Sequence, residues 1–258
     1  MALTASSAYA GLAEVWAVDA ALAYEPLAQH LVGRLPVALD GVLALDAGAG
    51  SGVAGRAMTA RGARVVSADR ELDMASYVAG SGPAVAADVG RLPVRDRAFD
   101  VGVAAFVVNH LADPGGGLRE LGRVTRAGGV VLVSTFSTER ASAKEAVDEA
   151  AERHGFVRPD WYLGMQVCAQ AVGDAGAVER ALRAAGFAHW TVTEEAVDVG
   201  ISAPEEVVRY RLGLPHLHAF ARSLTEEARG AFVADAVDAV TRTGARFAPR
   251  VVEAVAVP

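Results

Sequence analysis

The stretch Val42 to Gly52 constrains the fold of this chain more than any other feature, because an apolar run there passes into an acidic residue and a series of glycines. Its letters are VLALDAGAGSG, with glycine at positions 48, 50 and 52. A short apolar run before a glycine turn is typical of a buried parallel strand that leads into a helix. We expect this helix over roughly 53–61, where its free N–H groups and its dipole would favour an anionic ligand group.

The spacing of these glycines helps to decide which kind of nucleotide ligand the turn could bind. A glycine-rich loop after a strand occurs in many nucleotide-binding folds, because glycine lets the backbone turn sharply and lets a ligand come close to it. The dinucleotide fingerprint G-x-G-x-x-G would need glycine at position 53, which is Val53 in this chain. The spacing G-x-G-x-G therefore argues against a nicotinamide-type turn.

A second strand carries an acidic residue at a matching place. Residues 63–68 are apolar and β-branched, and Asp69 stands at the carboxyl end of this expected strand. In a doubly wound sheet such a carboxylate lies beside the first strand–helix turn and can accept both hydroxyls of a ribose. The alternative is that Asp69 caps the helix that we expect to start near Glu71.

Further elements follow in order. An apolar run over 84–87 ends at Asp88, which could accept the amino group of an adenine while Val89 packs on its ring. The next elements are a buried strand over 99–108, a helix over 116–124 and a strongly apolar strand over 129–135. We expect the segment RAGG (126–129) to form the turn between this helix and the strand after it. This alternation of strands and helices predicts an α/β fold.

At this point the chain resembles the class I S-adenosylmethionine-dependent methyltransferases, in the small-molecule branch with the ubiquinone/menaquinone-type methyltransferase domain. The segments that carry the resemblance are LDAGAGSG (45–52), VSADRELDM (66–74), AADVGRLPVRDRAFD (86–100), FVVNHLADP (106–114) and LRELGRVTRAGGVVLVST (118–135). It implies S-adenosylmethionine as cofactor and a Rossmann-like, doubly wound, seven-stranded sheet with a C-terminal antiparallel strand pair. Two departures are Ala49, where the family often has cysteine, and Glu71, where serine is common.

The resemblance also implies a set of cofactor-binding residues: Asp46, Gly48, Gly50, Gly52, Asp69, Arg70, Met74, Asp88, Val89 and Phe106. In this set Asp69 would bind the ribose. Arg70 and Val89 would flank the adenine, and Asp88 would take its amino group. The glycine turn and the acidic residue before it would border the methionine part of the cofactor, with Phe106 beside the methionine end.

Length and composition agree with one α/β domain. The chain has 258 residues, enough for a sizeable core, and its apolar runs are too short for a membrane span. We expect no secretory signal, because the N-terminus lacks a basic region before an apolar one. The lone Cys168 excludes an internal disulfide and suits a cytoplasmic protein. The net charge of −7 argues against a nucleic-acid partner, and we attribute the single lysine, Lys144, to coding bias.

We divide the expected single domain, 1–258, into four parts: an N-terminal helical lid (1–40), a cofactor-binding core (41–200), a helical insertion that forms part of the lid (202–244) and a last strand (251–257). One or two helices are expected over 4–35 and two or three in the insertion. Helices over 142–154 and 174–185 and a strand over 190–199 complete the pattern. A homodimer is a further expectation.

The lid is expected to supply the acceptor site, because ligands of open α/β sheets bind beyond the carboxyl ends of the strands. Methyl transfer from a sulfonium needs an aligned nucleophile and a dry cleft more than it needs acid–base groups. The lid segments offer several aromatic and histidine side chains: Tyr9, Trp16, Tyr24, Tyr210, His216, His218 and Phe220. The alternative for each of them is ordinary packing between amphipathic helices.

His110 is the candidate general base. It follows the fourth strand, near the place where the resemblance puts the sulfonium methyl group, and imidazole has an intrinsic pKa near neutrality. The alternative is a loop histidine that orders the turn before Asp113 and Pro114. No spacing of histidine, cysteine or paired carboxylates suggests a metal site, and we expect none.

Three classes of function remain open. The first is a methyltransferase that acts on a small metabolite, such as a specialised natural product. The second is an enzyme of the same fold that keeps the cofactor and catalyses a cyclisation or another non-methylating rearrangement. The third is a nicotinamide-dependent oxidoreductase, against which Val53 argues, as does the lack of a Tyr-x-x-x-Lys pair before Lys144. The first two classes share every cofactor residue, so the sequence does not separate them.

Overall fold

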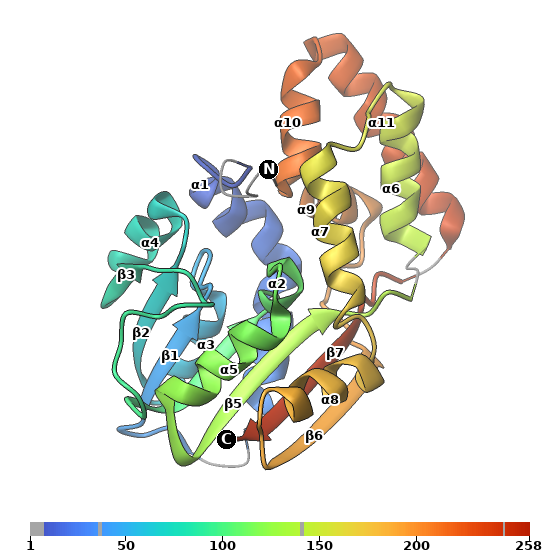
Figure 1. Ribbon diagram of the computed structural model, residues 1–258. Coiled ribbons are helices and arrows are strands. Elements are labelled where there is room, and N and C mark those ends of the chain that lie inside the picture. Colours follow the sequence, from blue (N-terminus) through green and yellow to red (C-terminus); the bar gives the residue numbers. More distant parts are fainter. Residues whose placement is uncertain (1–7, 36–37, 140–141, 245) are drawn as a thin grey trace.

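A seven-stranded sheet organises the molecule (Figure 1). The computed structural model describes residues 8–35, 38–139, 142–244 and 246–258, so residues 1–7 and 36–37 of the expected lid lie outside the described residues. The strands are β1 (Leu43–Ala47), β2 (Arg64–Asp69), β3 (Ala84–Ala86), β4 (Phe99–Ala105), β5 (Thr125–Phe136), β6 (His189–Ala196) and β7 (Arg250–Val257). Their order in the sheet is β3-β2-β1-β4-β5-β7-β6.

The direction of the strands confirms the expected fold class. Strands β1 to β5 pair in parallel, whereas β7 lies antiparallel between β5 and β6. The order reverses at β1 and β4, which is where open α/β sheets bind their ligands. The sheet is therefore doubly wound, with the C-terminal antiparallel pair that the family resemblance implies.

Helices cover both faces of the sheet. Helices α2 (Ala21–Gly33) and α3 (Val53–Thr59) pack together on one face. Helices α5 (Pro114–Val124) and α8 (Ala175–Ala184) cover the other and contact β4, β5, β6 and β7. Two separate groups of buried apolar side chains fill these two layers. Helix α4 (Leu72–Ala79) packs against β2 and β3.

The remaining helices stand beyond the carboxyl ends of the parallel strands, at the top of Figure 1. They are α1 (Ala13–Val15), the π-helical turn η2 (Trp16–Ala20), α6 (Ser142–Arg153), α7 (Asp160–Gln170), α9 (Pro204–Leu212), α10 (Pro215–Ser223) and α11 (Glu226–Thr243). The region 202–244 thus holds three helices, and α11 packs along α6 and α9. This helical layer includes described parts of the two segments that we assign to a lid, and that role stays a prediction.

Two expectations about elements are wrong, and one helix was not expected. The RAGG segment is not a turn outside the sheet, because β5 already begins at Thr125 and pairs there with Phe99. The register between β4 and β5 then shifts, and a side chain at Gly129 would lie 2.6 Å from the carbonyl oxygen of Asp100, so glycine permits a bulge within the strand. Strand β4 ends at Ala105 rather than at residue 108. Helix α7 is an element that the sequence did not predict.

Candidate functional site

A cavity lies at the carboxyl ends of β1, β2 and β4, beneath the N-terminal helices. All the predicted site residues line it except Asp46 and Gly52; those that do are Gly48, Gly50, Asp69, Arg70, Met74, Asp88, Val89, Phe106 and His110. Three lid candidates, Tyr9, Trp16 and Tyr24, line it as well. Residues far apart in the chain therefore meet at the place that the sheet topology favours.

The glycine turn has the backbone that only glycine adopts readily. Gly48, Gly50 and Gly52 have φ angles of 72°, 54° and 82°, all in the left-handed region. A side chain at Gly48 would also lie 2.4 Å from the side chain of Val107. Gly52 is the N-cap residue of α3 and does not line the cavity. Gly48 and Gly50 therefore expose backbone to the cavity, whereas Gly52 begins the helix.

Asp46 is buried under the turn instead of facing the cavity. Its Oδ2 accepts a hydrogen bond from the N–H of Gly55 in α3 at 2.8 Å. Burial raises the pKa of this carboxyl group to about 7, although the bond from Gly55 favours its charged form. In this position Asp46 fixes the start of α3, and its predicted contact with the methionine part of a cofactor stays a prediction.

Asp69 connects the end of β2 to the glycine turn. Its Oδ2 accepts the N–H of Gly50 at 2.7 Å, and its Oδ1 accepts the N–H of Glu71 at 2.9 Å. Burial raises the pKa of Asp69 from its ordinary value, and the two backbone bonds oppose that shift. The N-cap residue of α4 is Glu71, so Asp69 does not take the capping position. Each carboxylate oxygen keeps a lone pair for a hydroxyl in the cavity.

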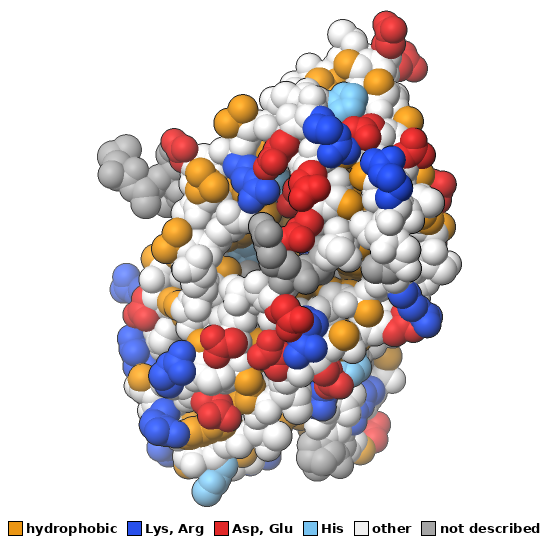
Figure 2. Space-filling model, turned by 90° about the vertical axis from the view of Figure 1, so that its right-hand side faces the viewer, with side chains coloured by type: hydrophobic (Ala, Val, Ile, Leu, Met, Phe, Trp, Pro, Cys, Tyr) orange, Lys and Arg blue, Asp and Glu red, His pale blue; other side chains and the backbone are white. Residues whose placement is uncertain are grey.

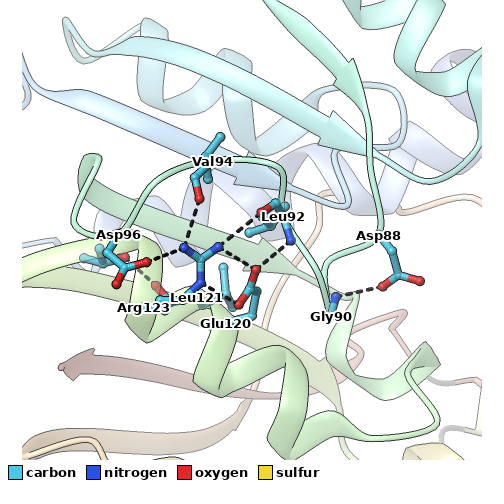
Figure 3. Close-up of polar contacts among 9 residues, drawn as sticks. Asp88, Gly90, Leu92, Val94, Asp96, Glu120, Leu121 and Arg123 are labelled. Carbon is cyan, nitrogen blue, oxygen red and sulfur yellow. Dashed lines mark hydrogen bonds and ion pairs between the residues drawn. The ribbon is translucent and has the colours of Figure 1, made fainter.

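The loop after β3 carries the residues predicted to meet an adenine. Val89 is buried at the cavity wall, whereas Asp88 is exposed and accepts the N–H of Gly90 at 2.7 Å. Figure 3 shows how α5 holds the continuation of this loop. Arg123 donates to the carbonyl oxygens of Val94 at 2.9 Å and Leu92 at 3.1 Å. The loop that carries Asp88 and Val89 is thus fixed from outside the cavity.

Glu120 completes this arrangement from the same helix. Its Oε1 accepts the N–H of Leu92 at 2.7 Å, and both of its oxygens accept bonds from the Arg123 guanidinium at 2.7 and 2.8 Å. The Arg123 fork also reaches Oδ1 of Asp96 at 2.6 Å. Our sequence analysis did not identify Glu120 and Arg123, although the segment LRELGR spaces the pair one helical turn apart.

Aromatic rings close the other end of the cavity. Phe106 directly follows β4 and has a φ angle of 57°, an uncommon conformation for a residue other than glycine. Its ring centroid lies 4.5 Å from that of Phe136 and 5.3 Å from that of Tyr24. Tyr24 in turn stacks on Trp16 at 5.2 Å. The strained backbone at Phe106 thus aims its ring at the N-terminal helices.

The lid candidates after residue 202 do not line this cavity. Tyr210 packs on Tyr24 and Phe247, and Phe220 packs on Phe156 and Phe232. His216 stacks on Tyr162 with ring centroids 3.9 Å apart, and His218 borders a separate surface pocket. For these residues the alternative of packing between helices describes the structure, apart from the contact of Tyr210 with a ring that lines the cavity.

His110 lines the cavity at the end of the short 3-10 helix η3 (Val108–His110). Its Nδ1 lies 3.5 Å from the hydroxyl oxygen of Tyr9. Burial, and then the positive charge of Arg70, lower the pKa of His110 to about 4. The imidazole is therefore neutral at physiological pH and a weaker base than its intrinsic pKa suggests. Its backbone N–H also bonds to Val107 in the turn.

The described residues hold one group of three possible metal ligands, and none of the three lines the cavity: His30, Glu195 and Glu253. Arg34 donates from Nε to Glu253 at 2.9 Å and also pairs with Glu195. The guanidinium supplies the positive charge that the two carboxylates require, so this group is an ion-pair network that joins α2 to β6 and β7.

Comparison with known sequences finds a match to the family of the methyltransferase domain over residues 45–133. Demethylmenaquinone methyltransferase of Mycobacterium sp. (strain KMS) is 36% identical over 154 residues, which are 55% of this chain and 66% of that protein. The corresponding enzyme of Mycolicibacterium gilvum (strain PYR-GCK) is 34% identical over 152 residues, 55% of this chain and 67% of the enzyme. The match thus spans about two thirds of these relatives.

Solved structures share the fold. Phosphoethanolamine N-methyltransferase 2 of Haemonchus contortus, in complex with phosphomonomethylethanolamine and S-adenosylhomocysteine, gives a TM-score of 0.58 at 16% identity, over 90% of this chain and 52% of that one. The [4+2]-cyclase SpnF gives a TM-score of 0.54 at 20% identity, over 91% of this chain and 80% of that one. Both likenesses concern the arrangement of the backbone.

Proposed function

Because the chain belongs to the class I S-adenosylmethionine-dependent methyltransferases, we propose that it transfers the methyl group of this cofactor to a small-molecule acceptor. The observation that carries the proposal is the cavity itself. At one end it has exposed glycine backbone and the Asp69 carboxylate, and at the other a cluster of aromatic rings around Phe106. The end with the glycine backbone and Asp69 suits a nucleoside, and the aromatic end suits a methyl transfer from which water is excluded.

The residues of the cavity fit the cofactor. Asp69 has lone pairs left for ribose hydroxyls, and the open backbone at Gly50 lets a ligand approach. Val89 and Met74 offer apolar walls to an adenine, and Asp88 offers an acceptor to its amino group. When bound, the cofactor supplies an electrophilic methyl group: a lone pair of the acceptor forms the new bond, and the electrons of the carbon–sulfur bond stay on sulfur.

The residues of the chain contribute mainly by alignment and by exclusion of water. Tyr9, Trp16, Tyr24 and Phe106 close the aromatic end, where they keep solvent away from a nucleophile and fix its approach. We propose that His110 takes the acceptor's proton. Its neutral imidazole is free to accept a proton over the physiological range, although its low pKa limits the driving force.

A non-methylating rearrangement is the second candidate, since the [4+2]-cyclase SpnF is built on this fold. Incubation with S-adenosylmethionine that carries an isotopically labelled methyl group separates the two candidates by mass spectrometry of the products. We expect the label in the product, with demethylmenaquinone-like quinols and specialised natural products as the acceptors to try first. A product that forms without the label would support the rearrangement.

The acceptor is proposed to be a small molecule and not a nucleic acid. The net charge is −7, and on the face in Figure 2 acidic and basic side chains are interspersed without a continuous basic patch. None of the described helices combines the length and apolar character that crossing a membrane requires. A cytoplasmic location, suggested by the lone Cys168, and a homodimer are further proposals, which fractionation and light scattering would test.

A further inference from the structure

A group of charged side chains lies in the helical layer behind the aromatic end of the cavity. We call Lys144 and Asp148 of α6 and Arg211 of α9 the Lys144–Arg211 cluster. Arg211 is 4% exposed and forms an ion pair with Asp148. The ammonium nitrogen of Lys144 lies 3.6 Å from the ring centroid of Phe136. The only lysine of the chain therefore lies on a ring behind the cavity wall, and our attribution of it to coding bias misses this placement.

Aromatic rings connect this cluster to the cavity without a break. Phe136, which contacts Lys144, lies 4.5 Å from Phe106, and Phe106 lines the cavity. On the other side Tyr24, which also lines the cavity, lies 6.1 Å from Tyr210, the residue before Arg211. The cluster thus stands one ring behind the cavity wall.

The charges of the cluster do not balance. Lys144 and Arg211 bring two positive charges when both are protonated, and Asp148 brings one negative charge. Nε of Arg211 is buried and has no hydrogen-bond partner among the described residues. Lys144 has a ring as its contact and no carboxylate within ion-pair distance in the described part of the chain. Burial, and then the charge of Arg211, lower the pKa of Lys144 to about 7.

A purely structural role accounts for only part of this arrangement. The pair of Arg211 with Asp148 joins α9 to α6, as buried ion pairs often do between elements. It does not use Nε of Arg211, and it does not require a lysine one helical turn before Asp148. An unpaired buried donor such as Nε of Arg211 costs free energy, and an anionic oxygen bonded to it would remove that cost. Half-buried Lys144 adds a second positive charge nearby.

We propose that the Lys144–Arg211 cluster is the acceptor subsite and that it binds the ionised oxygen of a small aromatic compound, such as a phenolate. The ring of Tyr24, which lines the cavity, and the rings of Phe136 and Tyr210 behind it lie between the cavity and the two cations, so a flat acceptor would enter by displacing ring contacts there. The two cations would stabilise its negative charge. Lys144 and Arg211 thus favour the nucleophilic form of the acceptor. The inference rests on the proposed function, because it identifies the bound anion with the methyl acceptor.

The test uses 4-nitrophenol and its uncharged methyl ether, 4-nitroanisole, as probes of the protein loaded with S-adenosylhomocysteine. We expect the phenolate to bind about tenfold more tightly than the ether, since one charge-assisted bond contributes about that factor. The yellow absorbance of the bound phenolate should also be visible at a pH where the free probe is mostly protonated. Equal binding of the two probes, or no binding of the phenolate, would overturn the proposal.

Variants at Lys144 test whether the preference for the phenolate over the ether comes from the Lys144–Arg211 cluster. Lys144→Met should lose about tenfold in phenolate affinity and leave the binding of the ether unchanged, whereas Lys144→Arg should keep most of the preference. Arg180→Met, which removes one charge from the exposed face of α8, is the matched control and should leave both affinities unchanged. A loss in Lys144→Met that Arg180→Met reproduces would indicate a general charge effect and contradict the subsite.

The single lysine also provides a spectroscopic readout that does not depend on turnover. Selective 15N-lysine labelling yields one side-chain ammonium resonance, from Lys144, and we expect phenolate binding to shift it and to raise the pKa that it reports. An unchanged resonance at saturating phenolate would refute the contact. A protein that binds the phenolate at Lys144 but never transfers a methyl group would refute the proposed function and leave the subsite intact.

Discussion

The cofactor end of the cavity is formed mainly by backbone groups, whereas its lid end is formed by side chains. The cofactor end uses backbone: Gly48 and Gly50 have left-handed φ angles, and the N–H groups of Gly50 and Glu71 hold Asp69. The lid end uses side chains from distant segments, with Trp16 from η2, Tyr24 from α2 and Phe106 after β4. The first is a fixed cradle, and the second depends on how helices pack.

This difference indicates which end of the cavity can change its ligand specificity by substitution. A backbone cradle accepts few substitutions, because a side chain at Gly48 would meet Val107 at 2.4 Å in addition to the strain of its φ angle. The lid side chains come from helices that stand mostly beyond the sheet, so an exchange there leaves the glycine turn and Asp69 in place. We therefore expect changes at the cofactor end to affect the binding of every ligand, and changes at the lid end to affect the acceptor alone.

The largest effect is expected for Asp69→Ala. Loss of two hydrogen bonds to a carboxylate should weaken S-adenosylhomocysteine binding by about 2–4 kcal/mol, or roughly 30- to 1,000-fold, without unfolding the protein. Asp69→Asn keeps an acceptor oxygen and should lose less. Isothermal calorimetry measures both variants, and an unchanged dissociation constant in Asp69→Ala would assign this residue to loop structure alone.

His110→Ala tests the reaction at the lid end. We expect the transfer rate to fall by roughly 10²-fold, the lower part of the range for general-base catalysis, because the pKa of His110 of about 4 makes it a weak base. Cofactor affinity should not change. His189→Ala, an exposed histidine on β6, is the matched control. Near-normal turnover in His110→Ala would leave this histidine with its structural role in the turn.

The pH dependence of the rate sharpens the same test. Burial depresses the pKa of His110, so the neutral base persists well below neutrality. The wild-type rate should stay level on the acid side until the pH approaches about 4, where the imidazole becomes protonated. A rate that already falls by half near the intrinsic pKa of histidine would show that His110 is solvated as in water, or that another group is the base.

Arg123→Ala should have a smaller effect at the cofactor end. Without its bonds to Leu92 and Val94, the loop that carries Asp88 and Val89 should loosen, and cofactor affinity should drop by about tenfold, which corresponds to about 1.4 kcal/mol. Arg119→Ala removes an exposed arginine from the same helix and serves as the control. Equal cofactor affinities in Arg123→Ala and Arg119→Ala would mean that the loop keeps its shape without the bonds from Arg123.

Amide hydrogen exchange should show the smallest and most distributed effect. The described N-terminal residues 8–35 and the region 202–244 lie outside the sheet, so we expect them to exchange faster than β1, β4 and β5 in the free protein. Their exchange should slow when cofactor and acceptor are both bound. Unchanged protection in these segments would indicate that the lid is preformed and that the difference between the two ends is not dynamic.

Features fixed by backbone geometry were predictable from the sequence. The glycine turn and Asp69 follow from local patterns, because a parallel strand, a tight turn and a helix need these residue types at these positions. The doubly wound sheet with its antiparallel pair follows from the family resemblance. Even there the direction of a side chain was not predictable, since Asp46 points under the turn to Gly55 and Gly52 serves as an N-cap. The sequence identifies such residues without saying which way they face.

Features fixed by tertiary packing were not predictable. The fork of Arg123 and the placement of Lys144 against Phe136 depend on contacts between distant elements. Helix α7 escaped prediction because only Tyr162 of its residues is buried, so it has no apolar stripe of helical period. Dependence on tertiary packing also explains the lid residues. The sequence offered Tyr9, Trp16 and Tyr24 together with His216 and Phe220, and only the packing of the helices decides that the first three line the cavity.

The most direct test of the account is a calorimetric comparison of S-adenosylhomocysteine and NAD on the wild-type protein and on Asp69→Asn. Our central claim is that the cradle of Gly48, Gly50 and Asp69 is a site for the sulfonium cofactor and its product. We predict that S-adenosylhomocysteine binds the wild-type protein at one site and that Asp69→Asn weakens it, with no measurable heat from NAD in either protein. Binding of NAD without binding of S-adenosylhomocysteine would contradict the account.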